Sequence, residues 1–322
     1  MVTVVLSLDI EKAYEMVWRR RVMDIITKHG IKGNIAKFVH NFIKERYINV
    51  RVRGTLSERY VLANGIPQGS VLSVTLFLLR INELQTKIKP PALVSMYADD
   101  CNICITGKHL SSIAVIAQNI LDTILEFSTE TGLKFSKTKS TFIIFSRKRS
   151  TEKTLSLNLG EHKIIQCKTL KVLGLLLDEK LFWIPHIKNL KVECTKRLKL
   201  MKIISHSAWG ADYTVLRRTY QAMIRAKMDY GSIFYDAANK NIKRILDPIN
   251  NTGARIICGA YRTSPVISML QEANLPPLDK RRRNLVVGYI IQVTANCGNP
   301  MNQIYQLTYR HRKKLCFKKK QP

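Results

Sequence analysis

Two adjacent carboxylates, Asp99 and Asp100, stand between two β-forming apolar runs in the stretch LVSMYADDCNICIT, residues 93–106. Two such runs that flank a short polar pair predict two strands joined by a tight turn. A third carboxylate, Asp9, follows the continuous apolar run of residues 2–8, which is typical of a buried strand. Three clustered carboxylates repel one another and offer only oxygen ligands, so they suit Mg²⁺ or Mn²⁺ rather than zinc.

Each of these aspartates also has a simpler interpretation. Asp is a common turn residue, so Asp99 and Asp100 alone are consistent with a solvated hairpin tip. Asp9 alone is consistent with a helix N-cap, because residues 11–29 predict a helix that Gly30 ends.

The elements around the aspartates predict how they are positioned. We expect a helix at 33–46, a hairpin at 47–62, helices at 70–89 and 110–130, and a strand at 138–146. The helix at 33–46 has an apolar stripe, including Ile35 and Phe38, that should face the core. This order is the split βαβ pattern of ferredoxin-like antiparallel sheets with helices on one face. A crossover makes the first strand parallel to the strand before Asp99, so the three carboxylates should meet at one edge of the sheet.

Four short stretches, one of which contains Asp99 and Asp100, stand out along the chain. They are Gly65-Ile66-Pro67-Gln68-Gly69-Ser70, Tyr97-Ala98-Asp99-Asp100, Gly132 to Lys139, and Leu173-Gly174 to Asp178 followed by Trp183 and His186. In this order, and with Asp9 and Tyr14 before them, they resemble the palm of a reverse transcriptase. The sequences of these motifs are most similar to those of reverse transcriptases from retrotransposons without long terminal repeats (LINE-type), of the jockey-like kind.

The resemblance implies a role for each of these residues. Asp9 and Asp99 would hold two Mg²⁺ or Mn²⁺ ions, with Asp100 as a supporting ligand, and Lys139 would protonate the leaving pyrophosphate. Tyr14 would exclude a 2′-hydroxyl, and the nucleotide site would include Gln68, Gly69 and Tyr97. Leu173 and Gly174 match the primer-grip turn. A core tyrosine and an ordinary hairpin are the alternatives for Tyr14 and Gly174.

Composition favours a polyanionic partner. The 322 residues contain 53 Lys and Arg against 23 Asp and Glu, a net charge of +30. The resemblance names the partners as an RNA template, a DNA primer and deoxynucleoside triphosphates. No apolar run approaches the length of a membrane span, and no convincing basic amphipathic helix supports a membrane-surface protein. Seven scattered cysteines predict reduced thiols inside a cell, and the family resemblance implies the nucleus.

The expected organisation is a palm at 1–180, a helical thumb at 181–260 and a helical connector at 261–322 with a basic tail between 310 and 320. Three short strands are expected in 155–177, and helices near 187–205, 212–228, 240–258, 264–273 and 278–296. Fingers, endonuclease and RNase H regions of the family are not found, which predicts a fragment of a longer protein that is a very weak or inactive polymerase by itself. The alternative function is a catalytically silent remnant that binds nucleic acid through its charge.

Overall fold

The computed structural model describes residues 1–147 and 154–302. It is a mixed α+β structure that divides into two compact units. The first unit is Met1–Leu170 with Asp178–Lys180, and the second is Lys171–Leu177 with the residues from Leu181 onward. The ranges expected to form a thumb and a connector both fall in the second unit, and the basic tail lies outside the described residues.

A mixed sheet forms the centre of the first unit. Strand β1 (Val2–Glu11) lies between β7 (Asp100–Gly107) and β9 (Thr141–Phe145), with β6 (Ala92–Tyr97) beyond β7 and β12 (Ile165–Gln166) beyond β9. β1 is antiparallel to β7 and β9, and β6 is antiparallel to β7, so β1 and β6 run parallel as expected. The short strand β8 (Lys134–Phe135) pairs with the end of β1, and β12 is parallel to β9.

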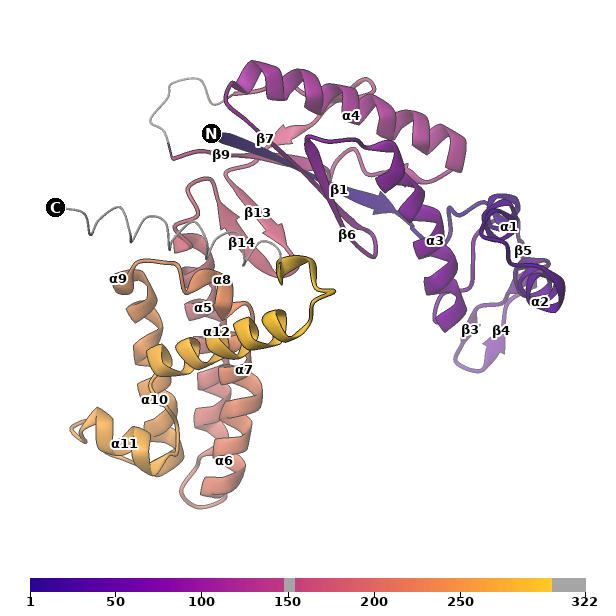
Figure 1. The fold of residues 1–322 in the computed structure, drawn as a ribbon. Helices are drawn as coiled ribbons and strands as arrows, with labels where there is room; N and C mark the ends of the chain where they lie inside the picture. Colours follow the sequence, from indigo (N-terminus) through magenta and orange to yellow (C-terminus); the bar gives the residue numbers. More distant parts are fainter. Residues whose placement is uncertain (148–153, 303–322) are drawn as a thin grey trace. The chain divides into compact units, whose positions relative to one another are not determined.

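One face of this sheet carries the core. Alternate residues of β1, namely Val4, Leu6, Leu8 and Ile10, are buried, which is the period-two pattern of a strand covered on one side. Helices α3 (Val71–Lys87) and α4 (Leu110–Thr131) contribute to the same core cluster, and Figure 1 shows α4 running along the sheet. The sequence pattern places Ile113, Ile116, Ile120, Ile124 and Phe127 on the inward face of α4, and all of them are buried except Ile116, which is partly buried.

Helix α4 corrects one expectation from the sequence. It is the one helix in the described part of the chain that is long and apolar enough to cross a membrane by length and composition. The packing explains its composition, since its apolar face lies in the core of the first unit.

The segment after β1 differs from the predicted helix 11–29. The strand continues to Glu11, residues 12–17 form a turn, and helix α1 begins only at Arg19 and ends at Lys28. Lys12 has a positive φ of 44°, and Glu15 N–H donates to the Lys12 carbonyl at 2.9 Å. Gly30 adopts the left-handed conformation expected of a residue that ends a helix.

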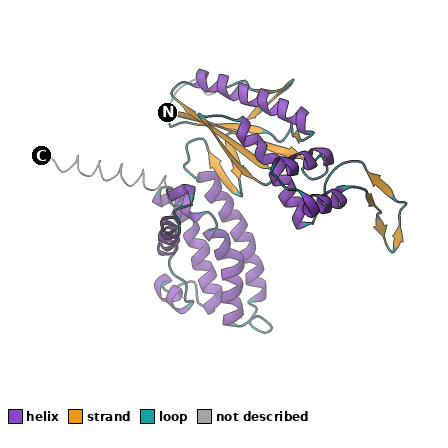
Figure 2. Ribbon diagram, turned by 45° about the vertical axis from the view of Figure 1, so that its right-hand side comes forward, coloured by secondary structure: helices purple, strands orange, loops and turns teal. Residues whose placement is uncertain are grey.

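Helix α2 (Gly33–Ile43) and the hairpin after it are more exposed than expected. Val39 and Ile43 are buried, but Ile35 and Phe38 are 65% and 62% exposed, so the prediction that they are core residues is wrong. The hairpin consists of β2 (Arg46–Ile48) with β5 (Tyr60–Leu62) and β3 (Arg51–Val52) with β4 (Thr55–Leu56). Figure 2 shows these strands extending from the helices of the first unit. Arg51 and Arg53 are exposed.

The rest of the chain is divided more finely than expected. Instead of three strands, the structure has five, which are β10 (Asn158–Leu159), β11 (His162–Lys163), β12, β13 (Thr169–Val172) and β14 (Leu175–Asp178). The second unit contains α5 (Ile184–Ile204), α6 (Tyr213–Tyr220), the π-helix η1 (Gln221–Arg225), α7 (Ala226–Asp229), α8 (Ser232–Tyr235), α9 (Lys240–Lys243), the 3₁₀ helix η2 (Arg244–Leu246), α10 (Asp247–Cys258), α11 (Val266–Glu272) and α12 (Leu278–Ala295). Helix α8 was not predicted.

The cysteines in the described residues are free, in agreement with the expected reduced thiols. Cys101 is buried, and burial raises its pKa to about 12. Cys104 lies three residues further along the same strand and therefore on the opposite face. The two thiols therefore do not point to a common site.

Candidate active site

The register of the central sheet brings two of the three aspartates together. Asp9 on β1 is the direct cross-strand partner of Asp100 on β7, and Tyr97 on β6 also pairs with Asp100. Ala98 and Asp99 form the two-residue turn between β6 and β7, with Ala98 at a φ of 53°. The predicted convergence at one edge of the sheet is confirmed for Asp9 and Asp100, with Asp99 next to them in the turn.

This arrangement decides between the earlier interpretations of Asp9. Asp9 lies inside a strand and not before a helix, so the N-cap interpretation is wrong. It belongs to the partly exposed series of β1 residues, on the face opposite the buried Leu8 and Ile10. Its carboxylate is therefore accessible from the face of the sheet that the core helices do not cover.

The three negative charges affect one another. Burial raises the pKa of Asp100, and the neighbouring carboxylates of Asp99 and Asp9 raise it further. The carboxylates of Asp99 and Asp9 are therefore close enough to disfavour ionisation of Asp100. A cation bound among these oxygens would remove that penalty.

Lys139 reaches the same place from another element. Its Nζ lies 3.2 Å from Oδ2 of Asp9, and its backbone N–H donates to Oγ of Ser136 at 3.3 Å. Ser136 N–H in turn donates to the backbone carbonyl of Asp9 at 2.7 Å. The loop after β8 is thus attached to the end of β1, which holds the Lys139 ammonium beside the carboxylates.

Tyr14 lies on the turn after β1 and not on a helix. It is half-buried, and its ring lies 5.5 Å from that of Phe77 on α3. The loop at Gly65 docks on this turn, because Ile66 N–H donates to the Tyr14 carbonyl at 2.9 Å and Gly65 N–H donates to the Val17 carbonyl at 3.0 Å. A Cβ on Gly65 would lie 2.9 Å from the carbonyl oxygen of Glu15, and its φ is 86°, so only glycine fits there.

The other residues expected in the nucleotide site are open to solvent. Gln68, Gly69 and Tyr97 are exposed, the last by 68%. Gly69 has a φ of 85° just before α3, which begins at Val71. The Gln68 and Tyr97 side chains are therefore accessible to a ligand.

Arg19 was missed by the sequence reasoning, although it holds this loop in place. Its guanidinium donates to four backbone carbonyls, of Gly65 at 3.1 Å, Lys44 at 2.7 Å, Leu62 at 2.7 Å and Asn64 at 3.2 Å. The four acceptors come from both ends of the hairpin and from the start of the Gly65–Ser70 loop. A single Arg among Arg19, Arg20 and Arg21 gave no sequence signal for this role.

Leu173 and Gly174 form the turn between β13 and β14 in the second unit. Both have positive φ, of 45° and 83°, as a two-residue hairpin turn requires. The Tyr230 hydroxyl donates to the Leu173 carbonyl at 2.6 Å and supports the turn. Trp183 and His186 are buried in the core of the second unit, with their ring centroids 6.0 Å apart. Nδ1 of His186 accepts a hydrogen bond from the Leu176 N–H at 3.3 Å.

The donor set suits a hard divalent cation. The described residues contain no group of three or more His, Cys, Asp or Glu side chains arranged as a ready metal site. Mg²⁺ is commonly held by one or two carboxylates together with substrate phosphates rather than by a complete protein cage. The paired Asp9 and Asp100 and the adjacent Asp99 fit that pattern.

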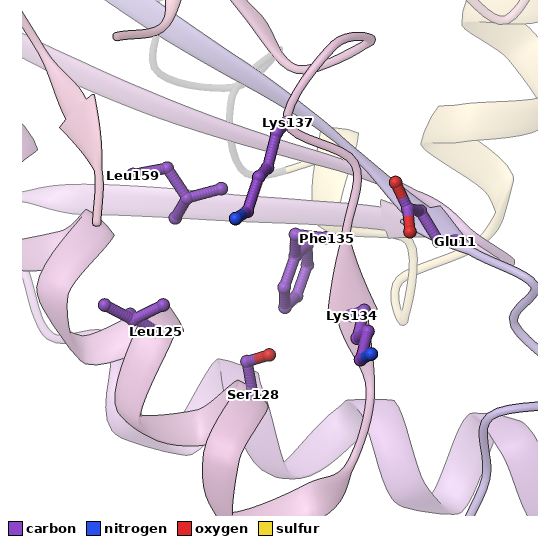
Figure 3. Close-up of a pocket in the computed structure, with 7 residues that line it drawn as sticks. All are labelled: Glu11, Leu125, Ser128, Lys134, Phe135, Lys137 and Leu159. Carbon is purple, nitrogen blue, oxygen red and sulfur yellow. The ribbon is translucent and has the colours of Figure 1, made fainter. Parts of the chain in front are cut away.

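A pocket of about 400 Å³ lies beside β8, on the segment that leads to Lys139. It is lined by Glu11, Leu125, Ser128, Lys134, Phe135, Lys137 and Leu159. Figure 3 shows the Phe135 ring and the Lys137 side chain directed into it. The three aspartates do not line this pocket, so it is separate from the candidate active site.

Comparison with known proteins identifies the family. The family profile described as reverse transcriptase (RNA-dependent DNA polymerase) matches residues 1–177, and the chain belongs to this family. It is related to the enzymes of retrotransposons without long terminal repeats, which confirms the resemblance found in the sequence.

Three relatives come from Drosophila melanogaster. The RNA-directed DNA polymerase from mobile element jockey is 23% identical over 295 residues, which cover 90% of this chain and 32% of that protein. The probable RNA-directed DNA polymerases from transposons X-element and BS are 24% and 25% identical, over 79% and 74% of this chain and 28% and 27% of those proteins. The chain therefore spans about a third of the length of these relatives.

Solved structures of telomerase are also similar. Apo telomerase from Candida tropicalis gives a TM-score of 0.44 at 10% identity, over 95% of this chain and 53% of that chain. Telomerase from Candida albicans, in complex with a fragment of telomeric RNA, gives 0.43 at 14% identity, over 86% and 51%.

Proposed function

We propose that this chain is the palm and a following helical region of a retrotransposon reverse transcriptase, and that it extends a DNA primer on an RNA template. The observation that carries the proposal is the cross-strand pairing of Asp9 with Asp100, beside Asp99 and Lys139. The sheet order β9-β1-β7-β6, with α3 and α4 on one face, supports a ferredoxin-like palm.

The carboxylates would hold the metal ions of the reaction. Asp9 and Asp99 would be the principal ligands and Asp100 a supporting one. Mg²⁺ ions held there would lower the pKa of the primer 3′-hydroxyl and neutralise charge on the triphosphate. The 3′-oxygen forms a bond to the α-phosphorus, and the bond from that phosphorus to the pyrophosphate oxygen breaks.

Lys139 is suited to act on the leaving group. Its ammonium lies 3.2 Å from Asp9 and is 72% exposed, so a triphosphate at the aspartates would come within its reach. There it would donate a proton to the departing pyrophosphate. The bond from its backbone to Ser136 would keep it in range.

Tyr14 would select the sugar and the Gly65–Ser70 loop would position the nucleotide. The half-buried Tyr14 ring packs against Phe77, and the Tyr14 carbonyl accepts a hydrogen bond from Ile66 in the Gly65–Ser70 loop. The position of the ring and the position of the loop are therefore coupled. A ring fixed in this way leaves no room for a 2′-hydroxyl. Gln68 and Tyr97 are exposed and available for contacts to the base or template. In the second unit, the Leu173–Gly174 turn would bear on the primer end.

The test is primer extension on poly(rA) with oligo(dT) and dTTP. Asp99→Asn should lower extension by at least ~10³-fold and leave RNA binding unchanged, because one metal ligand is lost and the basic surface is kept. The matched control is Asp24→Asn, which removes an exposed carboxylate paired with Arg21 at 3.6 Å. RNA binding without any Mg²⁺-dependent extension by the parent chain would overturn the proposal and favour a silent nucleic-acid-binding remnant.

A further inference from the structure

Helix α5 of the second unit carries a row of exposed lysines. Lys188, Lys191, Lys199 and Lys202 are all exposed. The first and third, and likewise the second and fourth, are 11 residues apart, which is close to three helical turns, so the four lie on one face. None of them forms a salt bridge with any residue in the described part of the chain. We call these four residues the lysine row.

The neighbouring face of α5 packs into the core and leaves the row in solvent. Ile187, Leu190, Cys194 and Leu198 are buried in the core of the second unit. The only acid on the helix, Glu193, is taken by Lys227 at 3.1 Å. The row spans 14 residues, ~21 Å at the helical rise of ~1.5 Å per residue.

The loop after α5 presents an aromatic platform. The rings of His206 and Trp209 stack at 5.3 Å with an interplanar angle of 14°, and Trp209 is 64% exposed. The loop is fixed by its own bonds, because Gly210 N–H donates to the His206 carbonyl at 2.7 Å and Ala208 N–H donates to His206 Nδ1 at 3.2 Å. A Cβ on Gly210 would lie 2.2 Å from that carbonyl oxygen, so the loop requires glycine. The indole is therefore held in place with most of its surface open.

We propose that the lysine row and Trp209 form a binding site for single-stranded nucleic acid. The lysines neutralise phosphates along the strand, and an unpaired base stacks on the indole beyond the C-terminal end of α5. Duplex bases are already stacked on one another, so a duplex could use the lysines but not the ring. An acidic peptide would likewise use only the charge. The site is formed by residues of the second unit alone and does not depend on the chemistry of the three aspartates.

The experiment measures the affinity of the full chain for a single-stranded 10-mer RNA at several salt concentrations. Trp209→Ala should weaken binding by ~5- to ~150-fold, the range for loss of one base stack. It should have no effect on an abasic 10-mer that keeps the phosphates. The matched control is Tyr261→Ala, which removes an aromatic side chain that is 84% exposed outside the site.

A charge variant tests the other half of the site. Changing Lys188, Lys191, Lys199 and Lys202 together to Gln should make the slope of log K against log salt less steep by about 3, since each phosphate contact on a single strand contributes ~0.7. The control changes four exposed cations elsewhere in the second unit, Lys240, Arg262, Lys280 and Arg283, to Gln. It should alter the slope by less than about 1.

Three results would overturn the proposal. They are a Trp209→Ala variant that binds the 10-mer like the parent, an abasic 10-mer that is equally sensitive to Trp209, and equal slopes for the two charge variants. A Trp209→Ala substitution that weakens binding of a duplex as strongly as binding of the 10-mer would also contradict it, because duplex bases cannot stack on the ring. Asp99→Asn should bind the 10-mer like the parent, so failure of the polymerase proposal would be seen separately.

Discussion

Replacing Arg19 by Ala should release the Gly65–Ser70 loop from the turn that carries Tyr14. Arg19 donates four hydrogen bonds to backbone carbonyls, and the two to Gly65 and Leu62 are part-buried. Without the guanidinium, these two oxygens lose a charged donor in a place that water reaches poorly. The loop is then held by the two backbone bonds to Tyr14 and Val17 alone.

The magnitude follows from the two part-buried bonds. A hydrogen bond from a charged donor contributes ~1.5 kcal/mol at the lower end of its range, and the two exposed bonds contribute less. Their loss shifts the balance between docked and released loop by about 3 kcal/mol, or ~150-fold. Because only the docked loop presents Gln68 correctly, the apparent KM for dTTP should rise by ~10- to ~100-fold. The kcat should change less, because the aspartates are untouched.

The assay is steady-state primer extension with dTTP as the varied substrate. Arg20→Ala is the matched control, since Arg20 is the next residue in the chain and is exposed. Arg19→Lys should be intermediate, because an ammonium cannot reproduce the guanidinium fork. Gly65→Ala should mimic Arg19→Ala, because its Cβ would press on the Glu15 carbonyl. Equal KM values for Arg19→Ala and Arg20→Ala would refute the assignment of Arg19 as the clamp.

Three further predictions concern single side chains. Tyr14→Val should raise the ratio of ribo- to deoxynucleotide incorporation, and an unchanged ratio would leave Tyr14 a purely structural residue. Burial, and to a lesser extent the charge of Lys227, lowers the pKa of His186 below the usual ~6.5. The neutral buried imidazole should therefore contribute fully to stability above pH ~6.5, and this contribution should be lost as the pH falls through the lowered pKa. His186→Gln should make the unfolding temperature less dependent on pH over this range. Burial and two neighbouring carboxylates raise the pKa of Asp100, so the native state disfavours its charged form. In the absence of metal, Asp100→Asn should therefore increase the free energy of unfolding at pH 7. This gain should vanish below about pH 4, where Asp100 is protonated in both the folded and the unfolded state.

The pattern of the sequence was sufficient for the centre of the first unit. Apolar continuity identified β1, and β-forming apolar runs identified the strands on either side of Ala98 and Asp99. The crossover rule then placed Asp9 and Asp100 together, and the observed register pairs them directly. The inward face of α4 was also predicted correctly, because its long apolar stripe has the helical period.

Tertiary contacts explain why residues 12–17 were predicted incorrectly. Local composition favours a helix there, but the carbonyls of Tyr14 and Val17 accept bonds from the Gly65–Ser70 loop. A helix through this segment would have used these acceptors internally. Long-range contacts of this kind override local propensity and leave no trace in a window of neighbouring residues. The same limit hid Arg19, whose partners lie 25 to 46 residues away.

The exposed face of α2 shows a second limit. The helical period of Ile35, Phe38, Val39, Phe42 and Ile43 was recognised correctly, but a period gives the orientation of a face and not what covers it. Within the described chain, the core reaches Val39 and Ile43 and leaves Ile35 and Phe38 in solvent. Hydrophobic character alone therefore overestimated the extent of the core.

The central claim is that carboxylates on the end of β1 and on the β6–β7 turn hold two metal ions for nucleotidyl transfer. The most direct test is the rate of single-nucleotide extension by the parent chain as free Mg²⁺ is raised from below its dissociation constants. A plot of log rate against log free Mg²⁺ should begin with a slope of about two, and Asp9→Asn should abolish extension at every Mg²⁺ concentration. A slope near zero, or an Asp9→Asn variant that extends the primer like the parent, would contradict the account.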